Sequence, residues 1–433
     1  MEIFRFYGGE LERRLEWWWK NLTDVCRTWR HIIFASPYSL NVRLACTDRT
    51  PTRTSLDIWP PFPIAISCGY GELDDEGRDN IIAALEHHDR IIQIDIVDQK
   101  RFVSEKFTAV TRKPFPVLRN LRLSSIDEIV IHEEFLGGSV PCLRNLVLEE
   151  IAFLALPKFA SSATHLSALT LDDIPMTGYI SPEAMAACLA TVPHLKFLSI
   201  GFKSPRSHPD RIGLLPPTRA VLPNLADFNF EGVSEYMEEL VARIDTPKLK
   251  RLEIYFFMDV MIHIPQLREF IARTETIRPL NPAMISFSSF FVNLVLGSYL
   301  GVAELMISCR DPDWQVSLMA QVCSQLSPLL SHVERLDVGQ SQARQGNGID
   351  PMQWFELFNP FPSVQSLYVR GELRPLVARA LQGLTGERAT DLLPTLRHLY
   401  LKGPSPSGSI REDIQTFIAA RQHSNHPVEV HWE

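Results

Sequence analysis

Apolar residues along this chain recur in a short motif of the form P-x-L-x-x-L-x-L. The two clearest copies occupy residues 116–123 and 141–148, and they share the run Leu-Arg-Asn-Leu 25 residues apart. Looser copies continue the series between residues 91 and 249 in steps of 23 to 30 residues, and further copies begin near residues 333, 364 and 396. A fixed period of this size indicates internal repeats.

The spacing within each copy predicts a short strand. The last two apolar positions are two residues apart, so both side chains point into the core while the residue between them points outward. Helical segments with start signals lie between several copies: Ser181-Pro182 before 184–190, Ser234 before 237–244, and Asp350-Pro351 before 354–358. We therefore predict an α/β fold in the form of a leucine-rich-repeat solenoid, with strand-helix repeats and a curved parallel sheet.

The period breaks between residues 261 and 331. Apolar alternation at 285–287, 291–296 and 304–307 is too closely spaced for full repeats, so we expect an irregular region or small meander there. Residues 279–303 carry no charge and are long enough to cross a membrane. Polar residues within the run, including Asn281, Asn293 and Ser298, favour buried strands over a membrane span.

Residues 1–45 contain no copy of the motif and include three consecutive tryptophans at 17–19. The apolar residues from Leu22 to Ile33 form one broad stripe at helical spacing, and Ser36-Pro37 is expected to end that helix. So short a segment cannot bury all of these side chains by itself. We expect a helical segment in residues 1–45, a linker in 46–62 and the repeat region in 63–433.

Composition narrows the class of partner. The formal net charge of -8 and the pI near 5.9 argue against a broad nucleic-acid or anionic-membrane surface. Seven scattered cysteines without a C-x-x-C pair are expected to be reduced, mostly buried thiols of an intracellular protein. Phosphate loops, zinc-binding helices and nucleophile motifs are not found, so we predict no catalytic, cofactor or metal site. His87-His88 is interpreted as surface, and Asp74-Asp75-Glu76 as the start of a helix.

Residues 25–33, Val-Cys-Arg-Thr-Trp-Arg-His-Ile-Ile, together with Ser-Pro-Tyr-Ser-Leu at 36–40, resemble the C-terminal half of an F-box. Residues 48–60 resemble the linker of F-box proteins of mushroom-forming fungi, a basidiomycete type that carries leucine-rich repeats. With the repeats, the resemblance covers nearly the whole chain. An F-box normally opens with a helix containing Leu-Pro, and here we expect that first helix to be incomplete, as in an N-terminally truncated F-box.

The resemblance implies the substrate-recognition subunit of an SCF-type cullin-RING ubiquitin ligase, in the cytoplasm or nucleus. Its helices would bind the small SCF adaptor protein, and its repeats would bind a protein substrate for ubiquitin transfer catalysed elsewhere. The alternatives are a non-catalytic repeat scaffold with a degenerate F-box, and an enzyme whose site is assembled from scattered residues.

Two groups of residues are predicted to bind these partners. The exposed adaptor-binding face is expected to consist of Trp17, Leu22, Val25 and Cys26, whereas Trp29 and Ile33 are assigned to a local core. The other interpretation of the stripe is that all of it packs a helical pair. For the protein target, tyrosine and arginine at outward strand positions are the strongest candidates, because these residue types dominate interface hot spots: Tyr255, Tyr368, Arg370 and Tyr400.

Overall fold

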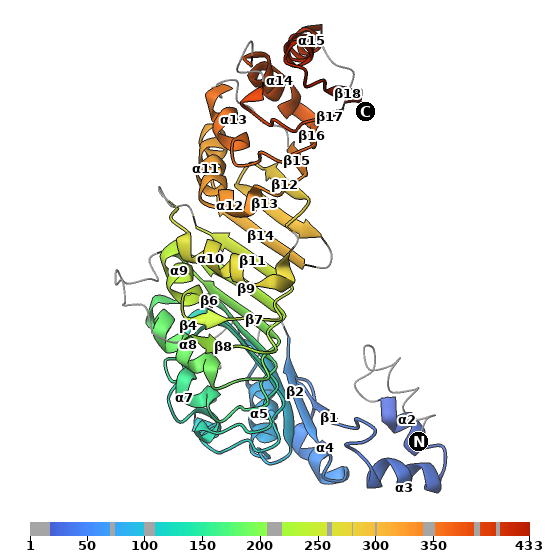
Figure 1. The fold of residues 1–433 in the computed structure, drawn as a ribbon. Coiled ribbons are helices and arrows are strands. Elements are labelled where there is room, and N and C mark those ends of the chain that lie inside the picture. Colours follow the sequence, from blue (N-terminus) through green and yellow to red (C-terminus); the bar gives the residue numbers. More distant parts are fainter. Residues whose placement is uncertain are drawn as a thin grey trace. The chain divides into compact units, whose positions relative to one another are not determined.

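The computed structural model describes residues 18–69, 74–98, 109–205, 219–257, 262–278, 280–298, 301–340, 351–384, 390–403 and 408–433. The chain divides into two compact units, Met1–Pro209 and Asp210–Glu433. Each unit is a mixed α/β structure built on a mostly parallel sheet with helices, as the alternation of strand and helix patterns predicts (Figure 1). Among the described residues, no helix combines the length and apolar character needed to cross a membrane.

In the first unit, neighbouring strands are parallel and follow the order of the chain. The strands are β1 (Leu44–Cys46), β2 (Ile64–Cys68), β3 (Ile91–Asp98), β4 (Asn120–Val130), β5 (Asn145–Ala152), β6 (Ala168–Ile174) and β7 (Phe197–Phe202). The helices are α2 (Trp18–Thr23), α3 (Arg27–Ala35), α4 (Thr52–Ile58), α5 (Asp75–Leu85), η1 (Phe135–Gly138), α7 (Leu156–Ala160), η2 (Met176–Gly178) and α8 (Pro182–Ala190).

The leucines of the motif form continuous rows across these strands. Those at the second motif position are direct partners from β4 to β7: Leu121, Leu146, Leu169 and Leu198. Each of them is at most 1% exposed. Burying one such side chain stabilises the fold by about 1.5–3 kcal/mol relative to leaving it in water. The repeated leucines therefore fix the register of the strands as well as the core.

In the second unit, the strand order departs from the order of the chain. The strands in spatial order are β9 (Asp227–Gly232), β11 (Arg251–Phe256), β14 (Gly301–Ser308), β13 (Phe291–Ser298), β12 (Ala283–Phe287), β15 (Arg335–Gln340), β16 (Ser366–Arg370), β17 (His398–Lys402) and β18 (Glu429–Trp432). A separate two-stranded sheet pairs β8 (Ala220–Val221) with β10 (Ile244–Asp245). The helices are α9 (Ser234–Val241), α10 (Pro265–Arg273), η4 (Glu275–Ile277), α11 (Pro312–Gln325), α12 (Ser327–Leu330), α13 (Pro351–Phe358), η5 (Gly371–Leu373), α14 (Arg374–Gln382) and α15 (Gly408–His423).

The break in the period corresponds to an antiparallel meander. Strands β12, β13 and β14 occur where the alternation predicts them, and β13 is antiparallel to both of its neighbours. Leu294 and Leu296, within the uncharged stretch, are at most 2% exposed and pack in the sheet. Parallel pairing resumes on either side of the meander, between β11 and β14 and between β12 and β15.

Two of the predicted helix starts have the expected caps. The Ser181 hydroxyl accepts the backbone N–H of Ala184 at 3.2 Å, and the Asp74 carboxylate accepts that of Gly77 at 2.7 Å. Ser234 is different, because it is the first residue of α9 and is buried rather than serving as the N-cap. Asp350 lies outside the described residues.

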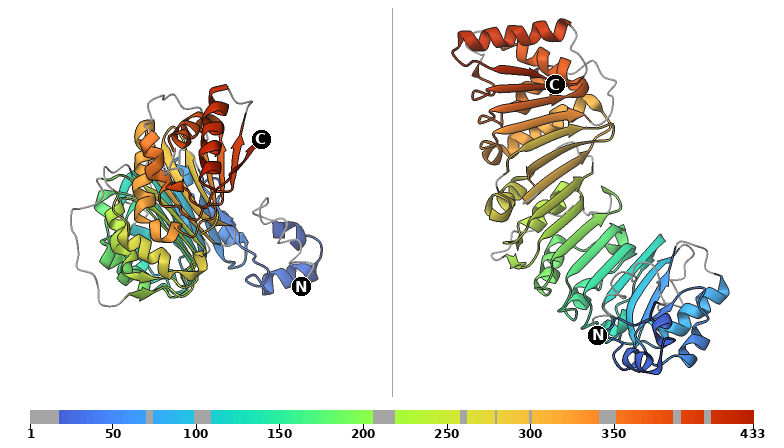
Figure 2. Two further views of the ribbon diagram at one scale, coloured as in Figure 1. Left: turned by 45° about the horizontal axis from the view of Figure 1, so that its top comes forward. Right: turned by 90° about the vertical axis from the view of Figure 1, so that its right-hand side faces the viewer.

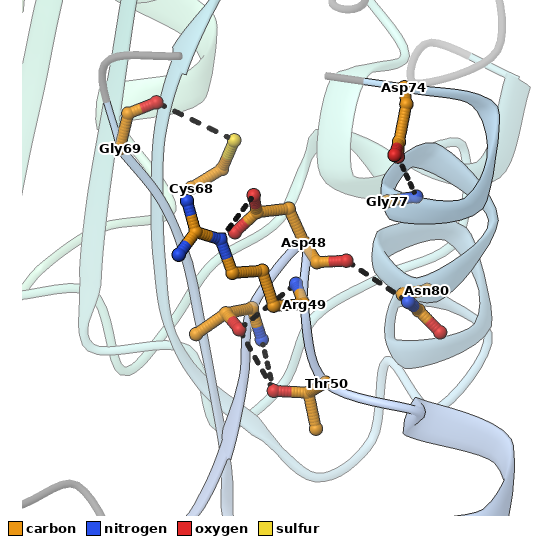
Figure 3. A network of polar contacts seen from close by, with 9 residues as sticks. Asp48, Arg49, Thr50, Cys68, Gly69, Asp74, Gly77 and Asn80 are labelled. Atoms are coloured by element: carbon orange, nitrogen blue, oxygen red, sulfur yellow. Dashed lines mark hydrogen bonds and ion pairs between the residues drawn. The ribbon is translucent and has the colours of Figure 1, made fainter. Parts of the chain in front are cut away.

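The segment predicted as a linker, residues 46–62, contains α4 and is held against α5 by polar contacts (Figure 3). The Asn80 side-chain amide donates to the Asp48 carbonyl oxygen at 3.0 Å, and its oxygen accepts the backbone N–H of Thr52 at 3.2 Å. A Cβ at Gly77 would lie 3.1 Å from the Asp48 Cβ, so glycine allows this close approach. The sheet itself begins at Leu44, two residues before the start of the predicted linker.

Candidate functional site

The apolar stripe near the N-terminus forms two helices rather than the one that its spacing predicts. Helix α2 ends at Thr23, and α3 begins at Arg27 after Cys26 in extended conformation. The Cys26 Sγ accepts the backbone N–H of Trp29 at 3.5 Å, and the Arg30 Nε donates to the Thr23 carbonyl oxygen at 3.0 Å. Both contacts satisfy backbone groups that helix ends leave without partners, which explains why the helix is interrupted here. Helix α3 ends at Ala35, with Ser36 as its C-cap, as predicted.

The residues predicted to bind an adaptor have different environments. Val25 is 58% exposed, and Cys26 is also exposed. Leu22 is only 8% exposed, contrary to the surface position expected of it. Trp17 lies outside the described residues. Of the predicted adaptor-binding residues that the structure describes, Val25 and Cys26 are therefore the exposed ones, and they lie between the two helices.

Leu22 is buried because α2 is anchored through Trp19. The Trp19 indole N–H donates to the Arg43 carbonyl oxygen at 3.0 Å, and its ring packs edge-on against Trp59 and Phe62, with centroids 5.0 and 5.2 Å away. Residues three apart share a helix face, so Leu22 turns inward together with Trp19. Of the two residues assigned to the local core, Ile33 is fully buried and Trp29 is half-buried.

On the second unit, three aromatic rings stack across the strands β16, β17 and β18. We call Tyr368, Tyr400 and His431 the aromatic column. The three residues are direct partners in the register. The Tyr368 and Tyr400 ring centroids are 4.2 Å apart with planes at 4°, and those of Tyr400 and His431 are 4.5 Å apart at 14°. Paired parallel strands lie about 4.8 Å apart, so this register itself brings the rings to stacking distance.

The column lies on the side of the strands opposite to the buried leucines. Its neighbours along the strands, Leu367 and Leu399, are fully buried, whereas Tyr368 and Tyr400 are half-buried. Helices α11, α13 and α14 lie along one side of this part of the sheet, and the strand side seen in the right-hand view of Figure 2 carries no such layer among the described residues. The column is thus reachable by another molecule.

Arginine side chains border the column and are held in place by one carboxylate. Arg370 donates from Nε and Nη2 to the Asp337 Oδ1 at 3.1 and 2.9 Å, and Arg335 donates from Nη2 to the Oδ2 at 3.0 Å. The Arg335 guanidinium also lies 4.2 Å from the centre of the Tyr368 ring, a cation–π arrangement. Because these side chains are already fixed, a partner would lose little side-chain entropy in binding them.

Tyr255 lies apart from the other three predicted target-binding residues. Its strand, β11, is separated from β16 by β14, β13, β12 and β15. At about 4.8 Å per strand, Tyr255 and Tyr368 are roughly 24 Å apart across the sheet. The structure therefore brings together Tyr368, Arg370 and Tyr400, while Tyr255 is half-buried elsewhere beside Phe257.

The outward side of the first unit has a different chemistry. The Asp172 Oδ1 accepts a hydrogen bond from the Ser199 hydroxyl at 2.9 Å, and Glu149 is the direct register partner of Asp172. Burial raises the pKa of Asp172, with a smaller contribution in the same direction from Glu149 and Asp173. Between the neighbouring strands β4 and β5, the Asn145 side-chain amide donates a hydrogen bond to the Asn120 side-chain oxygen at 2.6 Å.

Neither protein-family models nor curated proteins match this chain. The outward alternation of the motif predicts Tyr368, Arg370 and Tyr400 as candidates but not His431, because β18 carries no leucine motif. Val430, the register partner of Leu399, lies about one motif spacing further along the chain. This spacing could have predicted a further strand that includes His431.

Proposed function

We propose that this chain is the substrate-recognition subunit of an SCF-type cullin-RING ubiquitin ligase. In this proposal an F-box-like helical pair binds the small adaptor, and a leucine-rich-repeat solenoid binds a protein substrate. The solenoid part is supported by the rows of leucines in register from β4 to β7, since stacked repeats bury their cores against their neighbours in this way.

The observation that carries the recognition role is the aromatic column with its fixed arginines. Tyrosine and arginine held rigidly at an accessible surface are the residues that contribute most to interfaces. Asp337, which is 7% exposed, pairs with both Arg335 and Arg370, and the Arg335 guanidinium lies over the Tyr368 ring. Such an arrangement suits a protein target with carboxylate and apolar groups close together.

The adaptor-binding role is supported by a separate surface. Val25 is a large apolar side chain exposed at 58% within the residues that resemble an F-box. An exposed aliphatic residue beside an exposed thiol is a suitable contact for an apolar helix of a partner. The second candidate function, a repeat scaffold with a degenerate F-box, is favoured by the burial of Leu22, which leaves fewer apolar side chains for an adaptor.

Binding to purified adaptor protein distinguishes the two functions. We expect the chain to bind the adaptor and Val25→Asp to weaken the affinity by at least about 10-fold, because a carboxylate in an apolar contact costs more than about 1.4 kcal/mol. Ile58→Asp is the matched control, since Ile58 is 66% exposed in α4, outside the F-box-like residues, and its affinity should equal that of the unchanged chain. No binding by the unchanged chain would favour the scaffold.

A further inference from the structure

The register between β17 and β18 brings together three side chains that can bind a metal ion. His398 and Glu429 are direct partners, and His431 follows Glu429 by two residues, so it points to the same side of β18. All three lie on the same side of the sheet as the aromatic column. These side chains are close together only because β17, which carries His398, pairs with β18, which carries Glu429 and His431.

The possible ligand atoms converge on one point. The His398 Nδ1 lies 3.4 Å from the Glu429 Oε2, and the His431 Nε2 lies 3.9 Å from the same oxygen. One ligand atom from each of the three residues lies within 4.8 Å of the other two. Zinc–nitrogen and zinc–oxygen bonds of about 2.1 Å at tetrahedral angles place neighbouring ligand atoms about 3.4 Å apart. The His398–Glu429 separation already has this value, whereas the other separations would have to shorten on binding.

The two histidine nitrogens are also without a hydrogen-bond partner in the described part of the chain. Both the His398 Nδ1 and the His431 Nε2 are shielded from solvent. Shielded polar atoms are nearly always hydrogen-bonded, and an ion is one of the partners that accounts for an exception. Both nitrogens lie near the same Glu429 carboxylate, which would be the third ligand.

We propose that His398, Glu429 and His431 form a binding site for a divalent transition-metal ion, with zinc as the best fit. Imidazole ligands favour zinc and its neighbours in the periodic table over magnesium or calcium, which prefer oxygen ligands. Two histidines and one glutamate leave a fourth position for water or for a ligand from another molecule. This is at variance with the sequence analysis, which predicts no metal site.

The surroundings hold the ligands in place. The His431 ring stacks on Tyr400, and the His398 ring lies 6.3 Å from the same tyrosine. Packing of this kind restricts the histidine rings before the metal arrives, which lowers the entropic cost of binding. The proposal does not rest on the ligase function, because the site would bind metal whether or not an adaptor or substrate does.

The test uses the full chain after treatment with a chelator and dialysis. Isothermal titration with Zn²⁺ should give one site per chain with a dissociation constant in the micromolar range or tighter. Co²⁺ should give the visible absorption of a tetrahedral or five-coordinate ion. The His398→Ala/His431→Ala double variant should lose this site, and Glu429→Gln should weaken it by at least about 10-fold. His423→Ala/His426→Ala is the matched control, because both of these histidines are exposed outside the cluster.

Thermal unfolding provides a second readout that does not require a ligand titration. Zn²⁺ should raise the melting temperature of the unchanged chain and of the control, but not that of the His398/His431 variant. Circular dichroism without metal checks that the variants are folded, and Glu429→Gln serves if the double variant is not. Absence of Zn²⁺ binding at micromolar concentrations, or binding that is unaltered by both sets of substitutions, would overturn the proposal.

Discussion

Both units bury rows of leucines on one side of their strands, but the residues on the outward side of the strands differ between the units. In the first unit, the outward residues beside Leu146 and its partners are asparagine, aspartate and glutamate together with Arg122, which pairs with Glu149. In the second, Leu367 and Leu399 lie under stacked aromatic rings and arginine. The inner residues determine strand pairing, whereas the outer residues are free to vary without changing it. Binding chemistry is thus a property of the outer positions and not of the fold.

If the buried leucine rows of the two units are equivalent, truncating one leucine in either row should lower the free energy of unfolding by a similar, large amount. We expect Leu146→Ala and Leu399→Ala each to lower the free energy of unfolding by about 2–5 kcal/mol, since both residues are at most 1% exposed and leave a cavity. Urea unfolding followed by circular dichroism measures both. A loss below about 1 kcal/mol at either position would show that the rows are not equivalent.

On the outward side of the second unit, we expect the Asp337 carboxylate to contribute more to the free energy of unfolding than an ordinary surface carboxylate. Asp337→Ala removes the partner of both Arg335 and Arg370, so we expect a loss of about 1–3 kcal/mol in the free energy of unfolding. Asp227→Ala is the matched control, because within the described residues Asp227 forms an ion pair of 3.8 Å with Arg251 and both side chains are well exposed. The control should lose less than about 0.5 kcal/mol. Equal losses would contradict the special position of Asp337.

The smallest effect is expected on the acidic side of the first unit, and it depends on pH. Burial raises the pKa of Asp172 in the folded state above its unfolded value, so folding favours the protonated carboxyl group. The stability gained in this way is fully present at low pH and is lost as pH rises through the folded pKa. Asp172→Asn should therefore raise the melting temperature near neutral pH and have little effect near pH 3, while still accepting the Ser199 hydrogen bond.

A melting-temperature difference for Asp172→Asn that is the same at both pH values would contradict burial as the cause. Asp227→Asn provides the comparison. Loss of the Asp227 charge removes an ion pair with Arg251, whereas loss of the Asp172 charge removes a buried, desolvated carboxylate. This control should lower the melting temperature near neutral pH, the opposite sign to that expected for Asp172→Asn.

The strands and the buried rows could be predicted from the sequence because a two-residue spacing sets which side chains share a side of the strand. The break at Cys26 could not, since it depends on capping contacts made by Arg30 and by the Cys26 sulfur. Nor could the burial of Leu22, which follows from the packing of Trp19 on Trp59 and Phe62. Contacts between residues far apart in the chain leave no periodic signal.

The candidate site was predictable to a similar extent. Alternation placed Tyr368, Arg370 and Tyr400 outward, and the register brings them together. Tyr255 is separated from them by four strands, β12 to β15, whose existence the apolar alternation predicts but whose pairing into one sheet it does not. The pairing of His398 with Glu429 likewise depends on which strands are neighbours.

In the proposed function, one chain joins an adaptor-binding surface to a target-binding surface. The decisive measurement is the set of ubiquitin-conjugated proteins in cells that produce the unchanged chain, Val25→Asp, Tyr368→Ser/Tyr400→Ser, or the Asn120→Ser/Asn145→Ser control from the other unit. We predict at least one conjugated protein that depends on Val25 and on the two tyrosines but not on the asparagines. Conjugates that are the same for all four, or that respond to the asparagine pair and not to the tyrosines, would contradict the account.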